Sequence, residues 1–215
     1  MALRINTNEA SAYARVDLHR HTRQLVRTLG RISSGLRINS ASDDPAGLAI
    51  ANNLDTTSRS VTQATRNTND GLSILQTSEG ATTEVSELLK RMRELALASS
   101  SSTMNADERA LAHKDAQEMF SEVARIAKNT KHNDMKLTDG TLTNLDVQVG
   151  IDGTSDSRIN IKLANLSGSA LSLSTSNTDI STTTKAQAAV TNLDNALKTV
   201  NSYRSQFGSS ENRLS

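Results

Sequence analysis

Apolar residues recur every three or four positions along most of this chain, which is the spacing that places side chains on one face of an α-helix. In residues 4–38 the repeat is a heptad, because Leu18, Leu25 and Ile32 stand seven apart and Leu29 lies between them. This pattern predicts a helix with a narrow apolar seam that needs a partner helix. The predicted seam of this helix consists of Leu18, Leu25, Leu29 and Ile32.

The only proline of the chain stands between two helical patterns, in the stretch SASDDPAG. Serine and aspartate leave helices readily for local side-chain hydrogen bonds, and Asp44 directly precedes Pro45. A carboxylate is a good N-cap, and proline suits the first helical position, where its missing N–H costs no hydrogen bond. The sequence therefore predicts a joint here, with a second helix beginning at Pro45.

The longest heptad pattern predicts a helix over residues 45–98 with two parallel rows of small and apolar residues. One row reads Leu54, Val61, Thr68, Leu75, Thr82, Leu89 and Ala96. The other row reads Ile50, Thr57, Ala64, Gly71, Ser78, Val85 and Met92. Small residues indicate close approach of a neighbouring helix, although Gly71 and Gly80 each cost about 1 kcal/mol relative to alanine in a helix interior.

A shorter helix and a hairpin are predicted next. Asn105 followed three residues later by Glu108 is a capping-box pattern, and it starts a four-three apolar repeat over residues 105–129. The period then changes to two on both sides of the turn sequence DGTSDS. This alternation predicts a β-hairpin region at 138–166.

The last part of the chain is predicted to form loops and one returning helix. Serine and threonine dominate residues 167–184, which favours loops, and the four-three repeat returns over residues 185–213. The expected fold is mainly α: an elongated antiparallel helical bundle or coiled coil with a small β-hairpin region.

Composition favours thin helical packing over a deep globular core. Aromatic residues make up only 2% of the chain, whereas helices can bury narrow seams of Leu, Ile, Val and Ala. The absence of cysteine excludes a disulfide framework and a thiolate metal site. No apolar run reaches about 18 residues and the first residues lack an apolar signal region, so we expect neither membrane insertion nor a cleaved export signal.

The first forty residues form a basic arm with seven arginines and two acidic residues. A basic arm raises the alternative of a coiled-coil nucleic-acid binder. A solvated or interface-facing helix surface is favoured instead, because no lysine cluster or stacking aromatic residues accompany the arginines. Its ten Val, Leu and Ile residues are too few to offset the ordering of the arm, so we expect it to fold only against neighbours.

No arrangement of residues typical of catalysis or ligand binding stands out. His19 and His21 are two positions apart, so on a helix they point about 200° away from each other and cannot share a metal ion. His113 and His132 have no partners at ligand spacing, and phosphate-binding and nucleophile motifs are absent. We predict no enzyme activity, no catalytic residues, no metal site, no cofactor and no nucleic-acid or membrane partner.

Five blocks of the sequence together resemble bacterial flagellin. In chain order they read LRINTNEASA, RISSGLRINSASDDPAGLAIANNL, TQATRNTNDGLSILQTSEGATTEVSELLKRMRELALAS, EVARIAKNTKHNDMKLTDGT and LDNALKTVNSYRSQFGSSENRLS. They follow one another at family-like spacing through nearly the whole chain. The resemblance implies a structural subunit that polymerises with other flagellin subunits into the bacterial flagellar filament for swimming motility.

The resemblance also implies a division into domains and a route of export from the cell. Residues 1–42 would form an N-terminal helix that lines the filament core, and residues 43–215 would form a rod-like domain of the outer tube. Export in an unfolded state through the flagellar type III apparatus would place the secreted protein in the extracellular flagellum, beside hook-associated and cap proteins. The chain is expected to be a short form, without the family's variable outer domain and without its C-terminal core helix.

Two alternatives follow from the same resemblance. Flagellins are ligands of a vertebrate innate immune receptor. The resemblance implies that this receptor would bind the segment RMRELA. Arg91 would donate several hydrogen bonds to the receptor, and Leu95 would insert an apolar side chain. This receptor or subunit interface comprises Arg91, Glu94, Leu95 and Asp115. The same surface could instead serve packing between subunits, and a hook–filament junction protein of the same superfamily is the second alternative.

Overall fold

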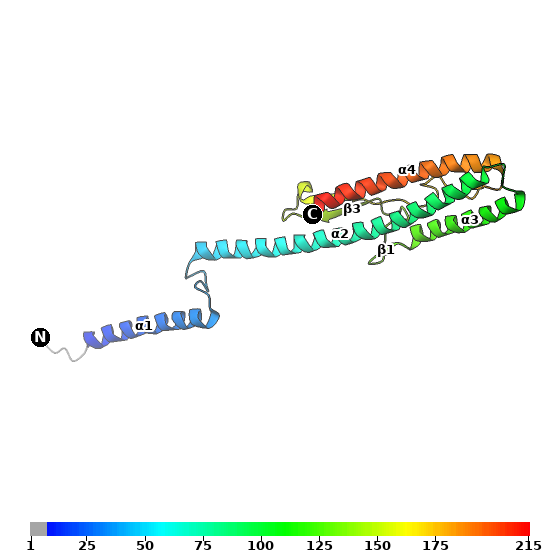
Figure 1. The fold of residues 1–215 in the computed structure, drawn as a ribbon. Coiled ribbons are helices and arrows are strands. Elements are labelled where there is room, and N and C mark those ends of the chain that lie inside the picture. Colours follow the sequence, from blue (N-terminus) through cyan, green and yellow to red (C-terminus); the bar gives the residue numbers. More distant parts are fainter. Residues whose placement is uncertain (1–7) are drawn as a thin grey trace. The chain divides into compact units, whose positions relative to one another are not determined.

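The computed structural model describes residues 8–215, and α-helices form most of them (Figure 1). The helices are α1 Glu9–Ser34, α2 Pro45–Ser99, α3 Ala106–Asn129 and α4 Thr183–Leu214. The predicted mainly-α fold with antiparallel helices and a small β part is confirmed. The part of the predicted core-helix domain that precedes Asn8 lies outside the described residues.

The chain forms two compact units, one that ends at Arg59 and one at Ser60–Ser215. The division between the units falls within α2, where the buried part of that helix begins. It is therefore a different boundary from the domain boundary predicted after residue 42. That boundary stays a prediction.

In the first unit, α1 ends in a hydrogen-bonded joint. Gly35 adopts a left-handed backbone conformation with φ of 70°, and its N–H donates to the Arg31 carbonyl at 2.9 Å. The Arg31 guanidinium also reaches across the joint to Asp43, with Nη2 3.1 Å from Oδ1. The Asn39 backbone N–H, followed by the Arg31 guanidinium, lowers the pKa of Asp43 below its ordinary value. The joint is therefore held by both charge and backbone capping.

Asp44 and Pro45 start α2 in the way that their order predicts. The Asp44 carboxylate accepts a hydrogen bond from the Gly47 N–H at 2.9 Å, which satisfies one of the unpaired donors of the first turn. The Asp44 carbonyl accepts the first intrahelical hydrogen bond, from the Leu48 N–H at 3.0 Å. Proline at the next position loses no hydrogen bond, since its N–H would have had no partner.

In the second unit, the two heptad rows of α2 form the centre of the core. Every member of both rows from Leu75 onward is buried, including Leu89 and Val85, which have no solvent exposure. The rows become exposed toward the start of the helix: Val61, Leu54 and Ile50 are 50 to 64% exposed. One continuous pattern thus contains a buried part and an exposed part.

Helix α3 turns back along α2 after a tightly bonded connection (Figure 1). The predicted capping box is present, because Asn105 Oδ1 accepts from the Glu108 N–H at 2.8 Å and the Glu108 carboxylate accepts from the Asn105 N–H at 3.0 Å. The Arg109 guanidinium donates to the backbone carbonyls of Ser99, Ser101 and Met104. A cation therefore satisfies the carbonyl group of the last residue of α2 and two carbonyl groups of the connection that follows.

Two antiparallel strand pairs follow α3. Strands β3 (Asn144–Gln148) and β4 (Arg158–Lys162) form the predicted hairpin, with Val147 opposite Ile159. A Cβ atom added to Gly71 of α2 would lie 3.1 Å from the Val147 side chain, so the absence of a side chain at Gly71 permits this close packing. Strands β1 (Lys131–His132) and β2 (Met135–Lys136) form a second, very short pair that the sequence reading did not predict.

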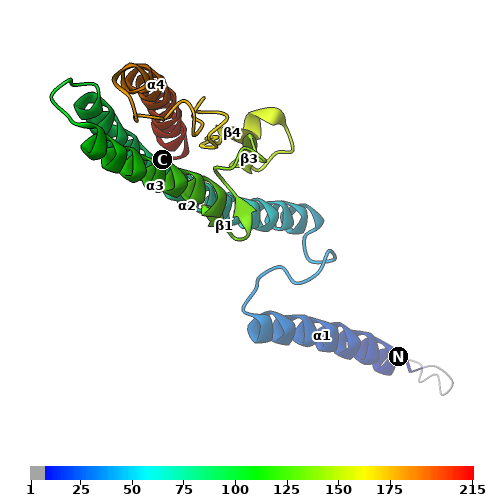
Figure 2. The same cartoon turned by 90° about the vertical axis from the view of Figure 1, so that its right-hand side faces the viewer.

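Helix α4 runs antiparallel to α2 and beside the β3–β4 hairpin (Figure 2). The Arg93 guanidinium of α2 contacts Asp194 in the first half of α4 at 2.6 Å, and Gly71 lies near Leu214 at the end of α4. Phe207 of α4 is 1% exposed. A short 3₁₀ turn at Ser155–Ser157 lies in the connection between β3 and β4.

The segment between β4 and α4 contains no further helix or strand, as its composition predicts, but it is not a solvated loop. Leu171, Leu173 and Ile180 are at most 3% exposed and belong to the same core cluster as the helices. Short Ser and Asn hydrogen bonds hold the backbone in turns, for example from the Ser167 N–H to the Asn165 side chain at 3.1 Å. The segment therefore closes one side of the bundle.

Gly80 differs from Gly71 because nothing within the described protein accounts for it. It lies on an exposed face of α2 with an ordinary helical backbone, and a Cβ atom added there would meet nothing within 4 Å. Glycine costs about 1 kcal/mol relative to alanine at such a position. The described fold therefore contains an uncompensated local cost at Gly80.

Candidate functional site

The apolar seam of α1 is uncovered within residues 8–215. Leu18, Leu25, Leu29 and Ile32 are 55 to 73% exposed, and no residue of α1 is buried. Their spacing of seven, four and three places them on one side of the helix, as the sequence predicts. An exposed apolar stripe of this length is typical of an interaction surface.

The remainder of α1 is basic. Arg20, Arg23, Arg27 and Arg31 line a shallow groove along the helix with Gln24 and Thr28. Arg20 pairs with Asp17 at 3.4 Å, and Arg31 pairs with Asp43. The helix is therefore amphipathic, with an apolar side and a positively charged side.

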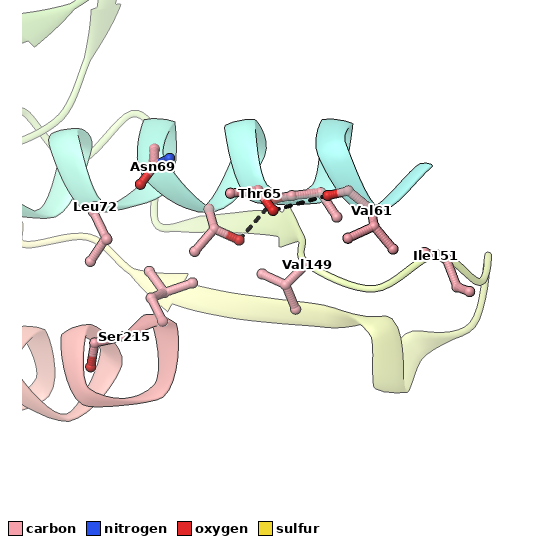
Figure 3. A pocket seen from close by; sticks show the side chains of 10 residues that line it. Val61, Thr65, Asn69, Leu72, Val149, Ile151 and Ser215 are labelled. Atoms are coloured by element: carbon pink, nitrogen blue, oxygen red, sulfur yellow. Dashed lines mark hydrogen bonds between the residues drawn. The ribbon is translucent and has the colours of Figure 1, made fainter. Parts of the chain in front are cut away.

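A second unpartnered apolar region lies where α4 ends. A groove of about 360 Å³ opens there between α2, the residues after β3 and the last residues of α4 (Figure 3). Its apolar lining includes Val61 and Leu72 of α2 and Leu214 of α4, together with Val149 and Ile151 after β3. The groove lies at the point where the heptad rows of α2 become exposed, so it continues the buried seam of the bundle.

The residues of the predicted receptor or subunit interface lie on α2 and α3. Arg91 and Glu94 are exposed and form an ion pair, with Nη1 2.8 Å from Oε2. Leu95 is partly buried and packs against the core, so only part of its side chain is available to a partner. Asp115 is exposed on α3, and its carboxylate has no ion pair within residues 8–215. Arg91 and Glu94 are therefore in contact, and neither forms an ion pair or a hydrogen bond with Asp115 within the described residues.

The half-buried His113 forms a polar cluster with Asp179 that sequence spacing did not reveal. His113 Nδ1 accepts from the Ile180 N–H at 3.3 Å and lies 3.6 Å from the Asp179 carboxylate. Its Nε2 atom lies 3.0 Å from the Gln117 side-chain amide. No hydroxyl or thiol nucleophile is bonded to this imidazole in the described chain, so the cluster fastens the 163–182 segment to α3.

The pKa of Asp179 lies well below its ordinary value. Burial raises the pKa of Asp179, but hydrogen bonds from Lys185 Nζ at 2.7 Å and from Ser181 outweigh it and lower the pKa to about 2. The carboxylate is therefore ionised at every physiological pH.

Asp179 is expected to stabilise the fold in a pH-dependent manner. Because its folded pKa lies below the ordinary value of 3.8, its contribution is complete above that value and is lost as pH falls toward 2. Replacing Asp179 with Asn should lower the free energy of unfolding by about 2 kcal/mol at pH 7 and by almost nothing at pH 2. Denaturant titrations at the two pH values measure this difference. Asp115→Asn is the exposed control, and an equal loss in that variant would contradict the assignment.

The described residues contain no cluster of metal-binding side chains. Within residues 8–215, no group of three or more His, Asp or Glu residues is arranged to hold a metal ion. His19 and His21 lie exposed on α1. Among the described helices, none has a stretch that is both long and apolar enough to cross a membrane.

Known proteins match this chain along most of its length. A sequence model of the bacterial flagellin N-terminal helical region matches residues 5–143. A flagellin of Halalkalibacterium halodurans is 38% identical over 98% of this chain and 76% of its own length. Flagellin E of Vibrio cholerae is 39% identical over 80% of this chain, a region that covers 45% of that protein.

Solved structures agree with the sequence relatives. The crystal structure of Bacillus cereus flagellin has a TM-score of 0.61 at 28% identity, covering 70% of this chain and 85% of that one. The structure of FliC from Burkholderia pseudomallei also has a TM-score of 0.61, at 21% identity over 67% of this chain, and supports the fold alone. The chain spans about half the length of some curated relatives and about three quarters of another.

Proposed function

Because this chain belongs to the bacterial flagellin family, we propose that it is a structural subunit that polymerises into the extracellular flagellar filament for swimming motility. One observation carries the proposal: α1 exposes a complete apolar seam and buries none of its residues. Such a helix is stabilised only when other chains cover it. A homopolymer supplies those chains in unlimited number.

The mechanism is burial of helical seams between copies. A filament requires head-to-tail contacts, in which one surface of a subunit meets a different surface of the next. The seam of α1 and the exposed start of the α2 rows are two separate apolar surfaces, and they are available for such contacts. In this proposal residues 1–42 line the inner tube and residues 43–215 form the outer rod.

The wider partners follow from family membership. We propose that the chain reaches the cell exterior through the flagellar type III export apparatus and meets hook-associated and cap proteins at the ends of the filament. A protein whose work is assembly needs no catalytic residues, cofactor or metal. The protein is proposed to be a structural component without enzyme activity.

Recognition by the vertebrate flagellin receptor is a second proposal, and it uses the exposed pair Arg91 and Glu94 with Leu95 and Asp115. An arginine that is paired only at the surface can exchange its carboxylate partner at low cost. Loss of receptor signalling in Arg91→Ala, with an unchanged circular dichroism spectrum, is the expected result. Unchanged signalling would remove this role.

Self-association tests the main proposal. Sulfate strengthens apolar burial, so increasing sulfate and protein concentration should convert the chain from monomers to oligomers and filaments. Sedimentation velocity follows the size distribution, and electron microscopy shows whether the products are filamentous. A chain that stays monomeric over the whole range would contradict the proposed function.

A further inference from the structure

The two sides of α1 differ in chemistry, and both are exposed. One side is the apolar seam. The opposite side is a basic ridge, which consists of Arg20, Arg23, Arg27 and Arg31. At about 100° per residue, the ridge is centred about 165° around the helix from the seam. Over residues 18–32 the helix therefore presents an apolar side and a cationic side at the same time.

The charge of α1 is mostly of one sign. Residues 9–34 contain five arginines and only two acidic residues, so their net charge is +3 when the histidines are neutral. Arg20 and Arg31 pair with carboxylates, but within residues 8–215 no ion pair is formed by Arg23 or Arg27. The ridge therefore has exposed guanidinium groups that are available to an anion outside the described chain.

An anionic bilayer provides a cover for the seam and a counter-charge for the ridge together. A helix of this kind lies in the interface, with its apolar side among the acyl chains and its arginines attracted to the headgroups. The helix is only about 10 Å thick, so the ridge stays within about one Debye length of the phosphates. From Arg20 onward an arginine recurs every three or four positions, so α1 fits a position parallel to the surface.

Two other partners would each use one side of α1. A second copy that covers the seam leaves the ridge on the far side of the helix without an anionic partner. A nucleic acid that binds the ridge leaves the seam in water, and Tyr13 is the only Phe, Tyr or Trp residue in residues 9–34 that offers a base a ring to stack on. The combination of seam and ridge on one helix therefore favours a lipid surface.

We propose that α1 of a free subunit binds the surface of an anionic phospholipid membrane, with the seam inserted among the acyl chains and the ridge attracted to the headgroup phosphates. This partner differs from the prediction of no membrane partner, which rested on the lack of an apolar run long enough to span a bilayer. Membrane binding does not depend on filament assembly. The two compete, because both cover the seam.

Vesicle binding by the full chain tests the inference, in sulfate-free buffer where sedimentation velocity confirms a monomer. The chain should co-sediment with vesicles of phosphatidylglycerol and phosphatidylcholine at least about tenfold more strongly than with vesicles of phosphatidylcholine alone. Hydrogen exchange locates the contact. The amides of residues 9–34 should exchange at least about tenfold more slowly on the anionic vesicles, whereas those of residues 60–215 should keep their rates.

A charge variant separates membrane binding from self-association. The variant replaces three arginines of the ridge, Arg20→Gln, Arg23→Gln and Arg27→Gln. Its binding to the anionic vesicles should fall at least about tenfold, because each arginine near an anionic surface contributes roughly fivefold. Glutamine is a comparable helix former and the seam is untouched, so self-association in the sulfate series should be unchanged.

The matched control removes three exposed cations from the second unit, Lys114→Gln, Lys128→Gln and Lys162→Gln. It lowers the total charge by the same amount and should bind the anionic vesicles as the parent chain does. Equal binding to both kinds of vesicle, an equal loss in the control, or slowed exchange only outside α1 would overturn the inference.

Two further outcomes separate this inference from its alternatives. Retention of the chain by single-stranded DNA, without binding to the anionic vesicles, would assign the ridge to a nucleic acid and would overturn the membrane role. A chain that self-associates but binds no vesicles would overturn this inference and leave the proposed function standing. A chain that binds vesicles but never self-associates would contradict the proposed function alone.

Discussion

A chain carrying Leu25→Asp and Leu29→Asp is expected to stay monomeric under conditions in which the parent chain associates, while its thermal unfolding midpoint changes by less than about 2 °C. Both leucines are more than half exposed, so they contribute little to the folded monomer. In an assembly they would be buried, and a carboxylate placed there would lose its hydration without gaining a partner. The effect on association should therefore be large and the effect on folding small.

Sedimentation velocity and thermal unfolding measure the two effects on the same samples. Gln24→Asp with Thr28→Asp is the matched control, because each position precedes one of the leucines and lies about 100° around the helix. It adds the same charge and the same poor helix formers beside the seam. Loss of association in the control would show that charge or helix propensity is responsible, and an associating Leu25→Asp, Leu29→Asp chain would contradict the role of the seam.

Helical periodicity predicted the elements well because packing in this fold follows narrow seams. The sequence pattern places helices at 45–98 and 185–213, and the structure has them at Pro45–Ser99 and Thr183–Leu214. The start of α2 was readable from Asp44 and Pro45 because capping is a local interaction between neighbouring residues. Such signals do not depend on the rest of the fold.

Contacts between distant residues could not be read in the same way. Nothing in the spacing of His113 and Asp179 indicates that they meet, since 66 positions separate them and the loop between β4 and α4 brings them together. The burial of Leu171 and Leu173 was missed because serine-rich composition is typical of solvated loops. The β1–β2 turn was missed because its signal is only Asn133 and Asp134, which tolerate the left-handed conformation that they adopt.

The candidate surfaces show a further limit of periodicity. The rows of α2 keep one heptad pattern from Ile50 to Ala96, yet Ile50 is 60% exposed and Ala96 is fully buried. A heptad pattern indicates only that a helix packs against a partner, and it does not indicate whether that partner belongs to the same chain. The structure separates the two cases, because α4 and the hairpin cover only the part of α2 from about Ala64 onward.

Phe207→Ala is expected to give the largest loss of monomer stability, about 3–5 kcal/mol. Phe207 is 1% exposed, and it is the largest of the fully buried side chains in a core otherwise made of Leu, Val, Ile, Met and Ala. Removing its ring leaves a cavity that a close-packed core fills only in part by rearrangement. The midpoint of thermal unfolding should fall by roughly 10 °C.

Leu111→Ala is the control for this prediction, because Leu111 is 67% exposed and its truncation should change stability by less than about 0.5 kcal/mol. Denaturant unfolding measures both variants, and a loss below about 1 kcal/mol for Phe207→Ala would contradict the packing of α4 into the core. The Phe207→Ala unfolding test and the Leu25→Asp, Leu29→Asp association test together distinguish apolar residues that stabilise the monomer from apolar residues that are expected to bind another copy. Residues 60–215 are expected to depend on Phe207 for their stability, whereas Leu25 and Leu29 are expected to contribute only after a second copy covers them.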